Sequence, residues 1–91
     1  MTITIYSKPD CRYCVAAKMF LDANRIDYNE VDIAQEQDKK DWLVGQGFRS
    51  VPQIFIGDEL FVNGGYAGLK EMSREKIIER INKLSGNTSN V

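Results

Sequence analysis

The stretch ITIYSKPDCRYCVAAKMFL, residues 3–21, decides the fold, because a strand pattern, a cysteine pair and a helix pattern follow one another within it. Its β-branched and apolar start predicts a strand over residues 2–7. The apolar run after the second cysteine predicts a helix over residues 13–24. The motif Cys11-Arg12-Tyr13-Cys14 therefore lies at a strand-to-helix turn, and Cys11 stands at the start of the helix.

The spacing and position of the two cysteines indicate redox chemistry. Residues three apart on a helix face the same side, within the Cα separation that a disulfide spans. The thiolate is the reactive form of cysteine, and a helix N-terminus stabilises negative charge. This layout favours Cys11 as a nucleophile with a low pKa and Cys14 as the resolving thiol.

A structural disulfide and a zinc site are the other interpretations of the pair. A disulfide that closes so short a loop stabilises a protein at or below the low end of the usual ~2–4 kcal/mol, and a reducing compartment would open it. A structural zinc ion needs about four ligands, and this chain has no histidine and no third cysteine. We therefore predict a redox function and no metal site.

The composition of the chain bounds the remaining function classes. Its 91 residues predict one domain, placed at residues 1–85, with a flexible C-terminal tail at residues 86–91. The net charge of −1 gives no general attraction to nucleic acid or to an anionic membrane surface. No apolar run approaches the ~20 residues of a membrane span, and no signal-peptide pattern opens the sequence. We expect a cytoplasmic monomer without nucleic-acid or membrane partners.

The pattern along the whole chain predicts an α/β fold with a four-stranded mixed sheet and helices on both faces. The expected order of elements is β-α-β-α-β-β-α. In the first helix we expect Val15, Met19 and Phe20 to face inward. The later elements are expected as a strand at 27–32, a helix at 35–44, a hairpin of strands at 53–56 and 60–62, and a helix that Ser73 caps and that carries Ile77, Ile78, Ile81 and Leu84.

Two backbone motifs allow both a structural and a functional interpretation. Val51-Pro52 either marks a strand boundary or contains a cis peptide that leaves the backbone of Val51 available to an extended substrate. Gly64-Gly65 either ends a hairpin or lets N–H groups at the start of the next short helix hold a ligand carboxylate. Local sequence does not decide between the interpretations.

Charged and aromatic side chains flank the cysteines. Lys8 and Arg12 are either solvated surface cations or groups that favour the thiolate and attract an anionic partner. Asp10 acts in the opposite direction, because a neighbouring carboxylate disfavours a thiolate. Tyr13 lies at the edge of any groove there, either as a half-buried ring or in contact with a bound peptide.

Taken together, three motifs resemble those of the glutaredoxins and occur in the same order. The resemblance covers nearly all of the chain, from Ile3 to about Leu84. It implies a thioredoxin-like fold in which Pro52 is a cis-proline that faces the active site. The motifs are residues 8–14 (KPDCRYC), 49–56 (RSVPQIFI) and 64–66 (GGY).

The resemblance also implies a reaction and its partners. Cys11 would attack a protein disulfide or a glutathione-mixed disulfide, and Cys14 would resolve the intermediate. Glutathione would then reduce the protein again, as a co-substrate. The implied partners are glutathione and disulfide-containing proteins such as ribonucleotide reductase.

The resemblance implies a glutathione groove beside the cysteines, and it assigns positions to two parts of the tripeptide. Lys8 and Tyr13 match positions that line this groove. Val51, before Pro52, matches the residue whose backbone pairs with the cysteinyl part of glutathione. Gly65 and the following Tyr66 match the site of the γ-glutamyl end.

Three departures from the family pattern bear on the function. Arg12 replaces the proline of the usual C-P-Y-C, which should shift the redox potential and the stability of the thiolate. Ser50 replaces the threonine of T-V-P and keeps its hydroxyl. Ala67 and Gly68 stand where the family usually has an acidic pair, whose first carboxylate binds the γ-glutamyl ammonium. A charge-assisted hydrogen bond of ~1.5–3 kcal/mol is then missing. We expect glutathione either to bind weakly or to be oriented through main-chain amides alone.

Two alternative functions follow from these departures and from the family. Residues 46–52 are also similar to redoxins that deliver electrons to ribonucleotide reductase and are recharged by thioredoxin reductase instead of glutathione. Some glutaredoxins instead hold an iron–sulfur cluster between two chains, through the N-terminal cysteine of each and two glutathiones. The resolving Cys14 and the departure at Ala67 weigh against the cluster.

Overall fold

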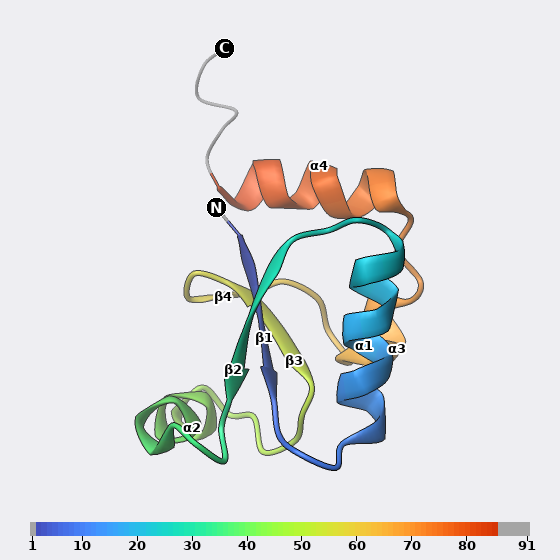
Figure 1. Ribbon diagram of the computed structural model, residues 1–91. Helices are drawn as coiled ribbons and strands as arrows, with labels where there is room; N and C mark the ends of the chain where they lie inside the picture. The colour runs from blue at the N-terminus through green and yellow to red at the C-terminus, as the bar shows by residue number, and fades with distance from the viewer. Residues whose placement is uncertain (1, 86–91) are drawn as a thin grey trace.

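A four-stranded sheet forms the centre of the structure, which is a computed structural model that describes residues 2–85 (Figure 1). The strands are β1 (Ile3–Ser7), β2 (Tyr28–Asp32), β3 (Gln53–Ile56) and β4 (Glu59–Leu60). Their order in the sheet is β2-β1-β3-β4. β1 pairs parallel with β2 and antiparallel with β3, and β3 pairs antiparallel with β4. The predicted mixed sheet is confirmed.

Helices cover both faces of the sheet, as predicted. They are α1 (Arg12–Ala23), α2 (Gln37–Gly45), α3 (Tyr66–Leu69) and α4 (Arg74–Leu84). In Figure 1, α2 lies on one side of the sheet, and α1 and α3 lie on the other. The parallel pair β1–β2 needs a crossover connection, and α1 provides it. The predicted order lacked α3, because its four residues are too few to show a helical period.

Each face of the sheet has its own hydrophobic cluster. On the α2 side, the ring of Phe55 makes edge contacts with Tyr6, Trp42 and Phe48, with centroids 5.5, 5.2 and 5.7 Å apart. Alternate residues of β1 and β3 serve opposite faces, so a one-residue slip would exchange the two clusters. The cluster on the α1 side contains the buried residues Ile3, Ile5, Ala17, Leu21, Ile26, Ile54, Ile56, Phe61, Leu69 and Ile77.

The inward face of α1 differs from the predicted one. Val15 and Met19 are 51% and 65% exposed, so the prediction that they face inward is wrong. Phe20 packs against the core from a half-buried position, in line with the prediction. The residues that are buried instead lie three and four positions apart, so they form a single face of the helix that excludes Val15 and Met19. The buried residues of α1 are Cys14, Ala17 and Leu21.

The turns and caps follow local sequence signals. Gly57 has a φ of 57° between β3 and β4, which confirms the predicted hairpin turn. Ser73 caps α4 as predicted, because its Oγ accepts a hydrogen bond of 3.2 Å from the amide of Lys76. Between residues 2 and 85, no helix has the length and apolar character needed to cross a membrane. The predicted tail at residues 86–91 lies outside the described residues.

Candidate active site

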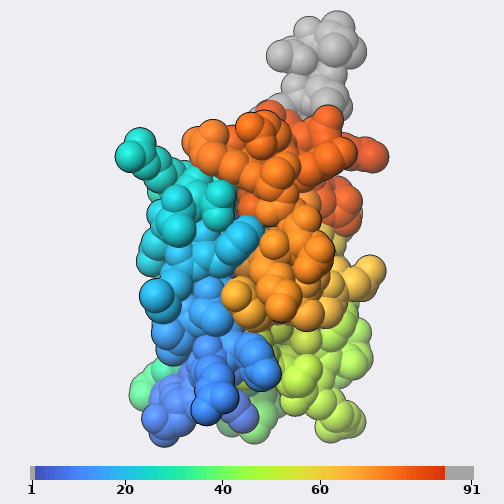
Figure 2. Space-filling model, turned by 90° about the vertical axis from the view of Figure 1, so that its right-hand side faces the viewer, coloured from blue at the N-terminus to red at the C-terminus, as the bar shows by residue number. Residues whose placement is uncertain are grey.

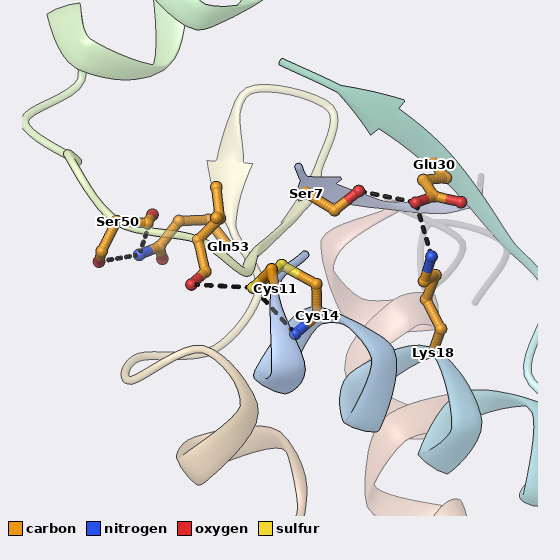
Figure 3. Close-up of a disulfide and its surroundings, with 8 residues drawn as sticks. Ser7, Cys11, Cys14, Lys18, Glu30, Ser50 and Gln53 are labelled. Atoms are coloured by element: carbon orange, nitrogen blue, oxygen red, sulfur yellow. Dashed lines mark hydrogen bonds and ion pairs between the residues drawn. A yellow bond between two sulfur atoms is a disulfide. The ribbon is translucent and has the colours of Figure 1, made fainter. Parts of the chain in front are cut away.

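The two cysteines form a disulfide at the N-terminus of α1 (Figure 3). Cys11 is the N-cap residue of α1, in extended backbone conformation, and its Cα lies 5.2 Å from that of Cys14. Cys11 is half-buried, whereas Cys14 is only 1% exposed. An incoming sulfur therefore has access to Cys11 and not to Cys14.

The start of α1 presents a hydrogen-bond donor to the sulfur of Cys11. The amide of Cys14 donates to Cys11 Sγ over 3.2 Å. First-turn amides have no partner within the helix, and they favour negative charge beside them. When the disulfide is reduced, this donor stabilises a thiolate at Cys11. The exposed cation Arg12 begins the same turn.

Alkylation of the reduced protein should label Cys11 about 10-fold faster than Cys14, because labelling follows thiolate character and exposure. The reduced protein is treated with iodoacetamide at mildly acidic pH, and the label is mapped by peptide mass spectrometry. In guanidinium chloride the two cysteines should label at similar rates, since the helix and the burial are lost. Preferential labelling of Cys14 in the native protein would contradict the assignment of the nucleophile.

The segment before β3 brings a backbone carbonyl to the nucleophile. The Val51–Pro52 peptide bond is cis, as the resemblance implies. The carbonyl oxygen of Val51 lies 3.8 Å from Cys11 Sγ. The last pair between β1 and β3 is Tyr6 with Gln53, so Val51 precedes the ladder. The backbone of Val51 therefore lies beside Cys11 Sγ and outside the strand ladder.

Gln53 holds this segment in place, a role that the sequence did not indicate. Its side chain is 7% exposed, and its Nε2 donates to the carbonyl oxygen of Ser50 at 3.1 Å and to Ser50 Oγ at 3.4 Å (Figure 3). A buried amide needs such partners. The polar residue at the start of an otherwise apolar strand was the available signal. Gln53 thereby ties together the two ends of the Ser50–Gln53 segment that carries Val51.

Gly65 and Gly68 allow the backbone to approach closely behind the site. Gly65 has a φ of 57°, and a Cβ at this position would lie 2.5 Å from the carbonyl oxygen of Pro52. A Cβ at Gly68 would overlap the carbonyl oxygen of Asn63. Only glycine fits at these two positions without a backbone shift. The glycine motif therefore brings α3 against the cis-proline segment.

These elements enclose a groove of about 450 Å³ beside the disulfide. Figure 2 shows the N-terminal end of α1 in blue, the segment around residue 50 in yellow-green and α3 in orange meeting on one face of the molecule. The predicted residue Lys8 is exposed and lies outside the lining, whereas Lys70, which the sequence did not indicate, is part of it. The lining consists of Tyr13, Ser50, Val51, Pro52, Gln53, Gly64, Gly65, Tyr66, Ala67 and Lys70.

Two tyrosines form one wall of this groove. Tyr13 of α1 and Tyr66 of α3 stack with ring centroids 6.2 Å apart and an interplanar angle of 28°. Tyr13 is 61% exposed, so much of its ring remains available to a ligand. Tyrosine rings combine apolar contact area with a polar hydroxyl, a combination common in binding sites. This wall connects the cysteine motif to the glycine motif.

Glu30 of β2 is linked to β1 by a hydrogen bond and to α1 by an ion pair (Figure 3). Glu30 Oε2 accepts a hydrogen bond of 2.7 Å from Ser7 Oγ and lies 2.8 Å from Lys18 Nζ. Lys18 and then Ser7 hold the pKa of Glu30 below its usual value, and the bond to Glu30 raises the pKa of Lys18. Lys18 lies one turn after Cys14, so this link fixes the helix that carries the cysteines. Its partners are far apart in sequence, so no local pattern reveals it.

The described residues hold no group of three or more His, Cys, Asp or Glu side chains arranged to bind a metal ion. The site offers two kinds of contact to a small molecule: a sulfur that can form a disulfide, and the adjoining groove. The groove lies within the ~300–1,000 Å³ range of small-molecule sites. Its lining offers backbone groups and tyrosine rings to a short extended peptide.

Comparisons with known proteins place this chain among redox proteins with such a site. The glutaredoxin family model matches residues 3–61. Glutaredoxin 1 of Rickettsia felis is 35% identical over 83 residues, which cover 88% of this chain and 79% of that protein.

Two solved structures share the fold over most of the chain. The buckwheat glutaredoxin–glutathione complex has a TM-score of 0.69 at 28% identity, covering 89% of this chain and 76% of its own. NrdH-redoxin from Escherichia coli, a glutaredoxin-like protein with a thioredoxin-like activity profile, has a TM-score of 0.65 at 26% identity. That match covers 87% of this chain and 93% of the redoxin. The predicted thioredoxin-like fold is confirmed.

Proposed function

Because the chain belongs to the glutaredoxin family, we propose that it reduces protein disulfides and glutathione-mixed disulfides through Cys11 and Cys14. The family relation and the Cys-x-x-Cys centre make it a thiol–disulfide redox protein. One observation carries the assignment of roles. Cys11 caps α1, accepts the amide of Cys14 at its sulfur and is accessible, whereas Cys14 is buried.

The reaction proceeds through two exchanges at sulfur. The Cys11 thiolate attacks one sulfur of the substrate disulfide, so that a bond forms to Cys11 and the substrate bond breaks. The other substrate sulfur leaves as a thiolate and takes a proton from solvent. Cys14, after losing its proton, then attacks Cys11 Sγ, and the bound substrate sulfur leaves. The substrate has gained two electrons, and the Cys11–Cys14 disulfide has formed.

Two glutathione molecules would reduce the Cys11–Cys14 disulfide again. The first attacks Cys11 Sγ, breaks the disulfide and releases the thiol of Cys14. The second attacks the glutathione sulfur of this mixed disulfide, which leaves Cys11 as a thiolate and yields glutathione disulfide. Attack at Cys11 is supported by the burial of Cys14. The backbone of Val51 and the ring of Tyr13 line the groove in which the tripeptide would lie.

Thioredoxin reductase is the alternative electron source. Ala67 lines the groove and offers no carboxylate to the γ-glutamyl ammonium. Gly68 packs against the Asn63 carbonyl, so an acidic side chain at this position requires a backbone shift. The similarity to NrdH-redoxin also favours this alternative. Among protein substrates, the similarity of residues 46–52 to ribonucleotide-reductase-linked redoxins favours that reductase.

A coupled assay tests the proposal and separates the two electron sources. The protein is supplied with a glutathione-mixed disulfide of a protein, NADPH and either glutathione with glutathione reductase or thioredoxin reductase. NADPH oxidation in the glutathione arm supports the proposed cycle. Turnover with thioredoxin reductase alone supports the alternative. Failure of both arms, with reduced protein that does not react with disulfides, contradicts an oxidoreductase function.

Replacing Ala67 with aspartate should lower the KM for glutathione by about 5-fold, because an exposed ion pair contributes up to about 1 kcal/mol. The new carboxylate would face the γ-glutamyl ammonium at the end of the groove. Ala67→Asn is the matched control, since it adds the same shape without the charge. Steady-state kinetics with varied glutathione provide the measurement. An unchanged KM for Ala67→Asp would mean that the γ-glutamyl end lies elsewhere.

A further inference from the structure

The groove beside the disulfide carries one charge among its described lining residues, and this charge is positive. Of the ten residues that line it, only Lys70 belongs to a charged residue type. Glu71 follows Lys70 in the sequence but is not part of the lining. Uncharged residues make up the rest of the groove. A ligand in it therefore meets a local charge of opposite sign to the overall net charge of −1.

The side chain of Lys70 is positioned by the aromatic wall. Its Nζ lies 5.5 Å from the ring centroid of Tyr66, within the range of a cation–π contact. Tyr66 in turn stacks on Tyr13, which lies between the two cysteines in the sequence. Side-chain contacts therefore connect the cation to Tyr13, a residue of the cysteine motif. Lys70 also lies three residues after Ala67, so both face the same side of the chain at α3.

From these observations we propose that Lys70 makes the groove selective for thiols and disulfides that carry a carboxylate close to the reacting cysteine. The carboxylate would pair with Lys70 Nζ, while the cysteine sulfur meets Cys11. This selectivity rests on the proposed disulfide exchange at Cys11. It adds a substrate class to that exchange: segments with a negative charge beside their cysteine.

The carboxylate can come from glutathione or from an acidic residue of a protein substrate. Both sources present the same group to Lys70, and a salt-screened ion pair with an exposed lysine should give a modest preference. The groove contains no second cation among the described lining residues that could replace Lys70. Removing this one charge should therefore remove the preference.

A single-turnover experiment measures the preference without any assumption about the electron source. Pre-reduced protein is mixed with short peptides that contain one cysteine, each as a mixed disulfide with 2-mercaptoethanol. The peptides carry Glu, Gln or Lys before or after the cysteine. A second arm compares the mixed disulfide of glutathione and 2-mercaptoethanol with the corresponding mixed disulfide of a glutathione analogue in which the γ-glutamyl α-carboxylate is an amide. Rates come from acid quenching and mass spectrometry.

Substrates with the carboxylate should react about 2- to 5-fold faster than their neutral counterparts, and lysine peptides should react more slowly. The ratio of the rate with a carboxylate substrate to the rate with its neutral counterpart should fall to about 1 in Lys70→Gln. It should drop below 1 in Lys70→Glu and persist in Lys70→Arg. High salt should weaken it. The control Lys40→Gln, on α2, should keep the parent ratio. A preference in only one arm would identify the source of the carboxylate.

Two outcomes would overturn the proposal. Lys70→Gln would leave the rate ratio of carboxylate to neutral substrates unchanged, or the parent protein would react equally fast with Glu, Gln and Lys peptides. In that case the neutral glutamine peptide would still react rapidly with Cys11, and the proposed disulfide exchange would stand. If no peptide reacted, the proposed function itself would fail. Because Lys70 is exposed, its variants should fold as the parent does.

Discussion

Replacing Cys14 with serine should abolish the reduction of protein disulfides while the reduction of glutathione-mixed disulfides continues. The two activities differ in how the mixed disulfide at Cys11 is resolved. With a protein disulfide, the substrate must be released by the second thiol, which is held on the same turn of α1 with Cα atoms 5.2 Å apart. With a glutathione-mixed disulfide, an external glutathione can release Cys11.

The expected loss on protein disulfides is at least about 100-fold, because a well-oriented internal nucleophile corresponds to an effective molarity of ~10⁵ M or more and external thiols reach only millimolar levels. Reduction of insulin disulfides and of a glutathionylated protein, measured with the same enzyme preparations, gives the comparison. Activity on the glutathionylated protein should stay within a few-fold of the parent.

Cys11→Ser is the matched control for this experiment. It keeps the buried thiol and removes the accessible one, so both activities should fall to background. Equal losses of both activities in Cys14→Ser would count against the two-step scheme. Retention of activity in Cys11→Ser would show that Cys14 can act as the nucleophile despite being 1% exposed.

Replacing Gly65 with alanine should destabilise the protein by about 2–6 kcal/mol, the sum of a strained backbone and an overpacked contact. The φ of 57° and ψ of −126° at Gly65 are unfavourable for any residue with a Cβ. The added Cβ would also press on the carbonyl oxygen of Pro52. A domain with a typical stability of ~5–15 kcal/mol would lose a large part of it.

Urea unfolding of the oxidised protein provides the measurement, with the midpoint and the slope both reported. Gly45→Ala is the matched control. No atom lies within 4 Å of a Cβ at Gly45, the last residue of α2, and its φ is not positive. This substitution should be neutral or stabilise by up to about 1 kcal/mol. Equal midpoints for Gly65→Ala and the parent would contradict the close approach to Pro52.

Much of the fold could be predicted because local signals and global structure agree in this chain. The β-branched and apolar run of β1, the cysteine at the start of α1 and Ser73 before α4 each specify an element from a few neighbouring residues. The errors arose where tertiary packing decides which side chains are buried. Val15 and Met19 are apolar enough for a core, but the helix turns another face, with Ala17 and Leu21, toward the sheet.

The parts of the candidate site with distinctive residue types could be predicted from the sequence. The parts that depend on contacts between side chains far apart in the sequence could not. Cys11 and Pro52 are unusual residue types at informative positions, and their proximity followed from a family resemblance. Lys70 looks like any surface lysine in the sequence. Its importance depends on α3, a four-residue helix without a periodic signal. The link between Lys18 and Glu30 similarly requires the packing of α1 on β2.

The two separate clusters on the faces of the sheet have a practical consequence for spectroscopy. Trp42 is the only tryptophan of the chain. This residue of α2 packs on Tyr6 and Phe55 of the sheet, whereas the disulfide lies at the start of α1, on the other side of the sheet. Its fluorescence should therefore report whether α2 is docked on the sheet and should change little when the disulfide opens. Trp42 fluorescence can then be used to follow the unfolding of both the oxidised and the reduced protein, so that their stabilities can be compared directly.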